Sequence, residues 1–282
     1  MSMVNRFSWI EGDAILRRCA SNITSALTLL ARPARLDDRH SWRRTPRDFA
    51  IAAAATIVVF LILMMLIDAA AIRGIKRFPI WVVSAFDDIT DYGKSGWFLW
   101  PLGLLFVGLS ALPPVLTPMS QRVLAAVMVR IGFLFTAIAV PSLFVTIVKR
   151  LIGRARPLVG GSLDPFLFVP FTWRVEYASM PSGHATTAFA ALVAFGTLWP
   201  RTRTIFLIYA LLIAISRVAV TAHYPTDVLA GALVGIAGAV LVRRYFAQRR
   251  LGFSIGPDGV VHQYPGASLR RMKAVARELL AP

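Results

Sequence analysis

Long runs of apolar residues alternate with shorter polar segments along the chain. Six of these runs approach or exceed the length of about 20 residues that a membrane-spanning helix needs. They cover residues 49–72, 96–116, 123–148, 183–199, 204–220 and 226–246. Apolar runs of this length with few charges are typical of helices in a bilayer. The pattern therefore predicts an all-α fold, a polytopic membrane protein built as a bundle of six transmembrane helices.

Polar segments at both ends divide the chain into three parts. Residues 1–48 form a basic segment, in which the stretch 15–30 fits either a short amphipathic surface helix or a disordered tail. Residues 49–250 form the six-helix membrane domain. Residues 251–282 form a C-terminal tail, with a Pro257-Asp258-Gly259 turn and an amphipathic helix near its end. We expect this tail to stabilise the protein rather than to form a second functional domain.

Lys and Arg residues lie mainly on one side of the predicted membrane domain. They occur in both terminal segments and in the turns after the second and fourth runs. The positive-inside rule assigns this side, with both termini, to the cytoplasm. The opposite side then receives the segments 73–95, 149–182 and 221–225. Acidic residues in the first of these, Asp87, Asp88 and Asp91, are expected to form a solvated loop rather than a cation site.

Composition supports a membrane protein and argues against nucleic-acid binding. The 282 residues are 57% hydrophobic and only 16% charged, whereas a soluble domain carries about a quarter charged residues. The formal net charge of +17 comes from basic clusters that flank apolar runs, a pattern that suits anionic lipid better than a nucleic acid. Cys19 is the only cysteine, so no internal disulfide is possible.

Three polar clusters lie next to the predicted spans, all at their non-cytoplasmic ends. The first is Lys149 followed after six residues by Arg156-Pro157, and the second is Pro181-Ser182-Gly183-His184. The third is Ser216-Arg217, then five residues, His223, three residues and Asp227. Because the clusters share one side of the membrane, we expect segments that are distant in sequence to meet there in a single site.

The residue types in these clusters suit phosphoryl chemistry. Lys149, Arg156 and Arg217 are fixed cations, and the two guanidinium groups match phosphate oxygens. Ser182 offers a hydroxyl, and the backbone N–H groups near Gly183 lie at a predicted helix N-terminus with Pro181 as a first-turn residue, which is a favourable place for an anion. The groups together would stabilise the negative charge of a transferring phosphoryl group.

Two histidines complete the predicted reaction. His223 has Asp227 four residues later, close enough to hold one ring nitrogen while the other attacks phosphorus. His184 would protonate the leaving alkoxide and later activate water. No carboxylate cluster accompanies the histidines at metal-ligand spacing, so we expect neither a metal nor another cofactor.

These motifs resemble the three-part signature of the type 2 phosphatidic acid phosphatase family, K-x6-R-P, P-S-G-H and S-R-x5-H-x3-D. Every fixed position of the signature is present, and the resemblance covers residues 49–246. It implies a phosphohistidine mechanism with His223 as nucleophile, Asp227 as its orienting partner and His184 as general acid and base. It also implies phosphate binding by Lys149, Arg156, Ser182, Gly183 and Arg217.

The implied function is metal-independent hydrolysis of a phosphomonoester or diphosphate on a membrane lipid. The sequence leaves the lipid open among phosphatidic acid, phosphatidylglycerol phosphate, undecaprenyl diphosphate and lipid A phosphates, and it leaves the oligomeric state open. For a Gram-negative bacterial source, we expect an inner-membrane protein whose active site faces the periplasm.

Three alternatives remain at this stage. The signature also resembles that of vanadium haloperoxidases, although these are soluble in character. A non-enzymatic lipid transporter or binding protein would need no nucleophile. Phosphotransfer to an acceptor other than water would use the same residues.

Overall fold

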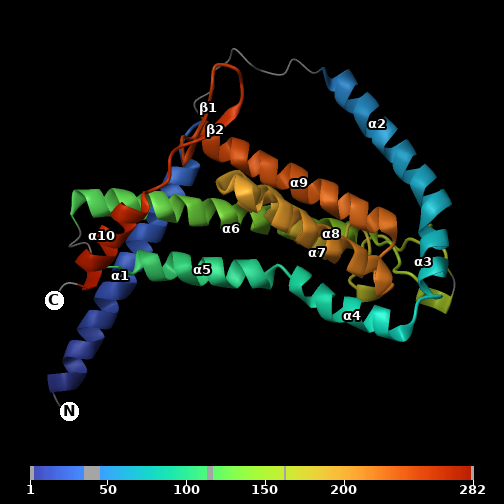
Figure 1. Cartoon of the computed structure of the whole chain (residues 1–282), viewed down its shortest axis with the longest axis horizontal. Helices are drawn as coiled ribbons and strands as arrows, with labels where there is room; N and C mark the ends of the chain where they lie inside the picture. The colour runs from blue at the N-terminus through green and yellow to red at the C-terminus, as the bar shows by residue number, and fades with distance from the viewer. Residues whose placement is uncertain (1–2, 35–44, 113–116, 162, 281–282) are drawn as a thin grey trace. The chain divides into compact units, whose positions relative to one another are not determined.

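The computed structural model describes residues 3–34, 45–112, 117–161 and 163–280, and helices make up most of this part of the chain (Figure 1). The basic stretch 35–44 and the end of the second predicted span, 113–116, lie outside the described residues. The helices are α1 (Met3–Ala31), α2 (Pro46–Leu63), the π-helical turn η2 (Met64–Asp68), α3 (Ala69–Ile75), α4 (Ile80–Thr90), the short 3-10 turn η3 (Asp91–Gly93), α5 (Gly96–Ser110), α6 (Pro118–Ile152), α7 (Gly183–Leu198), α8 (Arg203–Ala219), α9 (Pro225–Gln248) and α10 (Leu269–Leu280).

Each of the six predicted spans corresponds to a helix. Four helical segments are long and apolar enough to cross a membrane: Pro46–Ile75, Pro118–Ile152, Pro200–Ala219 and Pro225–Gln248. The other two, α5 and α7, have 15 and 16 residues and are therefore shorter than a full span. The mainly helical membrane architecture is confirmed, whereas the number of six crossings stays a prediction.

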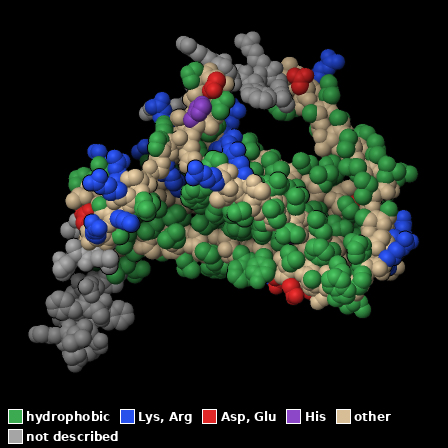
Figure 2. All heavy atoms as spheres, viewed as in Figure 1, with side chains coloured by type: hydrophobic (Ala, Val, Ile, Leu, Met, Phe, Trp, Pro, Cys, Tyr) green, Lys and Arg blue, Asp and Glu red, His purple; other side chains and the backbone are tan. Residues whose placement is uncertain are grey.

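The first apolar helix illustrates why this surface suits a bilayer. No residue of α2 is buried, although the helix is almost wholly apolar. Figure 2 shows hydrophobic side chains covering most of the visible face of the neighbouring helices as well. Apolar area of this extent is unfavourable in water and favourable against lipid chains.

Two regions of the chain differ from the sequence predictions. The acidic residues Asp87 and Asp88 lie on helix α4 rather than in a loop. This helix was missed because its 11 residues are too few for a span. The predicted 257–259 turn joins two short strands, β1 (Phe253–Ile255) and β2 (Val261–Gln263), which pair antiparallel and depart from a purely α-helical fold. Of the two possibilities left open near the N-terminus, the helix is observed, as α1.

The chain forms two compact units, and helices α6 and α9 contribute residues to both. The first unit comprises the described parts of Met1–Asp37, Phe98–Phe135 and Val242–Pro282. In it, Phe133 packs edge-on against Phe246 and Phe253, with ring centroids 5.6 and 4.8 Å away. Glu278 on α10 accepts hydrogen bonds from Thr117 and Ser120 at the start of α6, so the C-terminal tail is docked on this unit.

The second unit, Asp38–Trp97 with Thr136–Leu241, contains all the predicted site residues. In this unit, α7 lies very close to α9 because glycines line the contact. A β-carbon on Gly231 would lie 2.4 Å from the Ser182 carbonyl oxygen, and one on Gly235 would lie 2.4 Å from that of Thr186. Small residues four apart allow such close approach of two helix backbones. This contact holds the start of α7 against the start of α9.

Candidate active site

The first cluster lies where α6 ends. Lys149 is in the last turn, and the chain leaves the helix at Gly153, whose φ of +64° is left-handed and whose N–H donates to the Lys149 carbonyl at 3.1 Å. Glycine is the preferred residue for this way of ending a helix. A β-carbon at Gly153 would lie 1.8 Å from the Val169 carbonyl oxygen, so no other residue fits. The turn brings Arg154 and Arg156 directly after the helix end.

The second cluster forms the N-terminus of α7. The helix begins at Gly183 with Ser182 as N-cap, so the prediction that Pro181 occupies the first turn is wrong; it precedes the cap. The Ser182 N–H donates to the Asp227 carbonyl oxygen at 2.9 Å, which ties this end to α9. Lys149 Nζ lies 3.5 Å from the position that a β-carbon on Gly183 would take. The first two clusters are therefore adjacent.

Arg217 represents the third cluster at the end of α8. Its side chain is only 7% exposed, and one terminal nitrogen donates to Thr90 Oγ1 of α4 at 2.7 Å. Ser216 also donates to Thr90 Oγ1, at 3.0 Å. Helix α4, which the sequence did not predict, therefore holds Arg217 in place.

Three of the predicted phosphate-binding residues have a buried polar atom without a hydrogen-bond partner among the described residues: Arg156 Nε, Ser182 Oγ and Arg217 Nε. Buried polar groups are normally paired because leaving one unpaired costs about 1–3 kcal/mol. Two guanidinium N–H groups and a hydroxyl suit an anion with several oxygens. Burial lowers the pKa of Arg156, but from an ordinary value so high that the group remains charged near neutral pH.

His223 lies in the short connection between α8 and α9 and is 3% exposed. Its Nδ1 atom is 3.8 Å from Asp227 Oδ2, so the two side chains are neighbours, as the sequence predicted. The hydroxyl of Ser179 bridges them, donating to Asp227 Oδ2 at 2.6 Å and lying 3.4 Å from His223 Nδ1. The Tyr224 N–H also donates to Asp227 Oδ2, at 2.9 Å.

The surroundings of His223 favour its neutral form. Burial lowers the pKa of His223 to about 4, and the cations Arg217 and Arg156 act in the same direction, while Asp227 opposes them. An imidazole with this pKa is uncharged near neutral pH. Because Nδ1 faces the Asp227 and Ser179 oxygens, the other ring nitrogen is left with its lone pair available.

His184 lies in the first turn of α7 and packs against Gly93, where a β-carbon would lie 2.9 Å from the His184 ring. It is within electrostatic reach of Arg217, His223 and Lys149. All the predicted site residues thus lie at adjoining helix ends in the second unit. These are Lys149, Arg156, Ser182, Gly183, His184, Arg217, His223 and Asp227.

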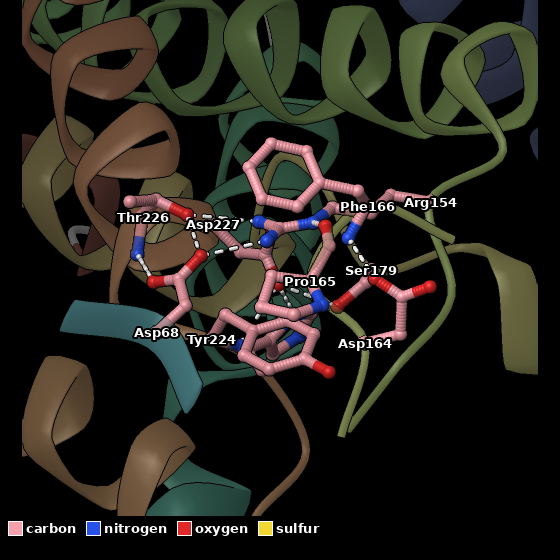
Figure 3. Close-up of polar contacts among 10 residues, drawn as sticks. Asp68, Arg154, Asp164, Pro165, Phe166, Ser179, Tyr224, Thr226 and Asp227 are labelled. Carbon is pink, nitrogen blue, oxygen red and sulfur yellow. Dashed lines mark hydrogen bonds and ion pairs between the residues drawn. The ribbon is translucent and has the colours of Figure 1, made fainter. Parts of the chain in front are cut away.

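Sequence reasoning missed four buried residues that contact Asp227 or its partners: Asp68, Arg154, Ser179 and Thr226 (Figure 3). Asp68 could have been selected from the sequence, because an ionisable residue inside an apolar span is a functional candidate by default. Arg154 lies inside the six-residue gap between Lys149 and Arg156, where the motif specifies no residue. Ser179 and Thr226 carry no comparable signal.

Comparisons with known proteins identify several relatives of this chain. The model of the PAP2 superfamily matches residues 130–251. The lipid A 1-phosphatase of Rhizobium johnstonii is 34% identical over 80% of this chain and 93% of its own length. The lipid A 1-phosphatase of Rhizobium etli is 35% identical over 72% of this chain and 88% of its own. The crystal structure of Aquifex aeolicus LpxE has a TM-score of 0.46 and 23% identity, over 63% of this chain and 95% of that one.

The similarity to the two Rhizobium proteins extends over nearly their whole length, and the match to the family model covers the three motifs between Lys149 and Asp227. The chain therefore belongs to the PAP2 superfamily and is a membrane enzyme that hydrolyses lipid phosphates.

Proposed function

We propose that the enzyme removes the 1-phosphate of lipid A through a phosphohistidine intermediate, without a metal ion. The observation that carries the mechanism is a buried His223 whose Nδ1 faces Asp227, together with unpaired buried hydrogen-bond donors of Arg156, Arg217 and Ser182 in the same group of motifs. The relatives named lipid A 1-phosphatases support the choice of substrate.

The phosphoryl group would be held by charge and by oriented N–H groups. Arg156 and Arg217 would donate their free Nε–H groups, Ser182 its hydroxyl, and Lys149 would add a positive charge beside Gly183. The N–H groups at the start of α7 have no partners within the helix and are suited to an anion. These donors would stabilise the charge on the equatorial oxygens during in-line transfer.

His223 would attack phosphorus with the ring nitrogen that does not face Asp227. A P–N bond forms as the P–O bond to the sugar breaks, and His184 gives a proton to the departing oxygen. The imidazole becomes positively charged, and the nearby Asp227 carboxylate stabilises that charge. His184 then takes a proton from water, whose oxygen attacks phosphorus. The P–N bond breaks, which releases phosphate and restores neutral His223.

The groups that this site offers support the proposed metal independence. The described residues contain no group of three or more His, Cys, Asp or Glu side chains placed to hold a metal ion. The cations Lys149, Arg156 and Arg217 would supply the charge that a metal supplies in other phosphatases. We expect a chelator to leave the activity unchanged.

The site would open to the outer side of the cytoplasmic membrane, with six helices in the bilayer and both termini in the cytoplasm. The distribution of Lys and Arg supports this orientation. Helices α5 and α7 would complete the set of six, since both are apolar and packing against longer helices tolerates a short span.

Phosphate release by purified protein in detergent tests this proposal. The substrate panel is lipid A, phosphatidic acid, phosphatidylglycerol phosphate and undecaprenyl diphosphate, each with and without chelator. We expect preferential release from lipid A, and a loss of at least about 1000-fold in His223→Ala. The matched control is His262→Ala, which changes an exposed histidine of the C-terminal tail and should retain full activity.

Radiolabelled lipid separates the mechanism from the substrate. An acid-labile phosphoprotein should form in the wild-type enzyme and not in His223→Ala. Substantial release by His223→Ala would remove this residue from the nucleophile role. Preference for another lipid would overturn the substrate while leaving the mechanism, and loss of activity with chelator that magnesium restores would overturn metal independence.

A further inference from the structure

We propose that the buried pair of Asp68 and Arg154 positions Asp227 and preserves its negative charge for His223. The inference rests on the proposed function, because it assigns to these two residues a role exerted through the proposed orienting carboxylate. It adds two positioning residues from segments outside the three motifs.

The contacts form a continuous network (Figure 3). One terminal nitrogen of Arg154 donates to Asp227 Oδ1 at 2.5 Å, and the other donates to Asp68 Oδ2 at 2.6 Å. Thr226, the neighbour of Asp227, donates to both oxygens of Asp68, through its N–H at 3.1 Å and through its hydroxyl at 2.6 Å. Asp68 therefore holds both Arg154 and the first turn of α9.

The two carboxylate oxygens of Asp227 accept hydrogen bonds from different residues. Oδ1 accepts from Arg154, whereas Oδ2 accepts from Ser179 and from the Tyr224 N–H on the side of His223. Rotation of the carboxylate would break contacts on both sides. Arg154 is fixed in turn by the Pro165 carbonyl at 3.0 Å and by the Tyr224 ring, 4.5 Å from its guanidinium carbon. Arg154 thus holds one oxygen of Asp227, while Ser179 and the Tyr224 N–H hold the other.

Charge explains why a second carboxylate is present. Arg154 and Asp227 alone would form a neutral pair, and the guanidinium would offset the attraction of Asp227 for a positively charged His223. With Asp68 the cluster carries one net negative charge. This charge is completely buried, since Asp68, Arg154 and Asp227 are each 0% exposed, so solvent screens it little. The cluster therefore favours the imidazolium that the attack on phosphorus creates.

Stability alone is a poor explanation for these buried charges. Removing ions from water costs several kcal/mol each, and apolar replacements of buried ion pairs are often neutral or stabilising. Asp68 also closes the π-helical turn η2 in an otherwise apolar helix, and such turns are frequently found at functional sites. A charged cluster that joins η2, the segment after α6 and the start of α9 beside the nucleophile suits a functional role.

Asp68→Asn tests the proposal, because it removes the charge and keeps the size. We expect kcat on lipid A to fall about 10- to 100-fold with little change in KM, which is the range found when partners that orient metal-bound histidines are removed. The matched control is Ile72→Ala, one turn further along the same helix and also 0% exposed. It should lower the melting temperature at least as much as Asp68→Asn while keeping kcat close to the wild-type value.

The pH profile distinguishes charge from loosened structure. Besides Asp68 and Arg154, the charged and titratable groups near His223 are Asp227 from α9, Arg217 from α8, Arg156 from the segment after α6, and His184 from α7. Loss of a negative charge should move the acid limb of kcat/KM to lower pH. If the substitution merely opened the site to water, the pKa of His223 would rise toward the ordinary histidine value and the acid limb would move to higher pH. Either that result or an unchanged acid limb would overturn the proposal.

A double-mutant cycle with Asp227→Asn tests whether Asp68 acts through Asp227. We expect Asp68→Asn to have less than a third of its effect on kcat when Asp227 is already replaced, since coupled residues are not additive. Equal effects in both backgrounds would contradict the proposal. If Asp68→Asn does not fold, Arg154→Lys replaces it, because one ammonium group cannot hold both carboxylates in the same way. Failure of the proposed function can be distinguished from failure of this proposal, because the wild-type enzyme would then release no phosphate from lipid A.

Discussion

At the residue scale, the environment of His223 determines what the side chain can do. Its ring is buried beside Arg217 and Arg156, and Ser179 and Asp227 occupy the side of Nδ1. A histidine in water would be partly protonated near neutral pH and would then lack a lone pair. The lowered pKa favours the neutral ring, and a carboxylate lies where positive charge would develop in the proposed reaction.

The lowered pKa of His223 predicts a pH-dependent stability. Between about pH 6.5 and pH 4 the unfolded chain takes up a proton at this residue and the folded protein does not, so stability falls as the pH falls. The shift corresponds to about 3 kcal/mol. Melting temperatures in detergent should therefore drop less on acidification in His223→Gln than in the wild type. His262→Gln should behave like the wild type, and equal drops in all three proteins would contradict the assigned pKa.

At the element scale, the contact between α7 and α9 brings two motifs together. Gly231 and Gly235 allow the two helix backbones to approach so closely that a β-carbon at either position would clash with a backbone oxygen. The Ser182 N–H can then donate to the Asp227 carbonyl, which links the start of α7 to the start of α9. Site geometry thus depends on residues that have no chemical role.

Replacing Gly235 with Ala should disturb both stability and activity. The new β-carbon would lie 2.4 Å from a backbone oxygen, which forces the two helices apart, and we expect a loss of about 1–3 kcal/mol with a reduced kcat. Gly108→Ala is the matched control, because this glycine is also inside a helix and has nothing within 4 Å of its added carbon. It should be neutral or stabilising by up to about 1 kcal/mol. Similar melting temperatures for the two variants would contradict the close packing.

At the scale of the whole molecule, the apolar helices carry the predicted site residues at their ends or in the segments next to them. Helix α6 has 35 residues and is about 50 Å long, which exceeds the bilayer core of about 30 Å. Lys149, near its C-terminal end, therefore has ample helix to reach the membrane surface. In the proposed function, this arrangement would let a lipid head group reach the buried site while its acyl chains remain in the bilayer.

The proposed orientation can be tested with the natural cysteine. Cys19 on α1 is the single cysteine of the chain and is partly exposed. A membrane-impermeant maleimide should label it only after the membrane is permeabilised, because the N-terminal segment is assigned to the cytoplasm. In a Cys19→Ser background, Trp173→Cys should be labelled in intact cells, since Trp173 is 83% exposed in the segment before α7. The reverse pattern would place the active site on the cytoplasmic side.

The sequence by itself determined the membrane character, the helical positions and the three motifs. Each of these depends on local information: apolar runs long enough for a bilayer, and residue types at fixed spacing near helix ends. Lys149, Arg156, Ser182, His184, Arg217, His223 and Asp227 could therefore be selected, and the structure brings them together. Their roles as nucleophile, acid and phosphate ligands remain predictions for the assays above.

Only the tertiary structure decided which other residues support this site. Asp68 and Asp227 are 159 positions apart, and no local pattern shows that Arg154 joins them. Ser179 bridges His223 and Asp227, a contact that spacing alone had assigned to the pair directly. Helix α4 was hidden because it is too short for a span, yet its Thr90 holds Arg217. Long-range contacts depend on how helices pack, and packing is set by the whole chain at once rather than by any one segment of it.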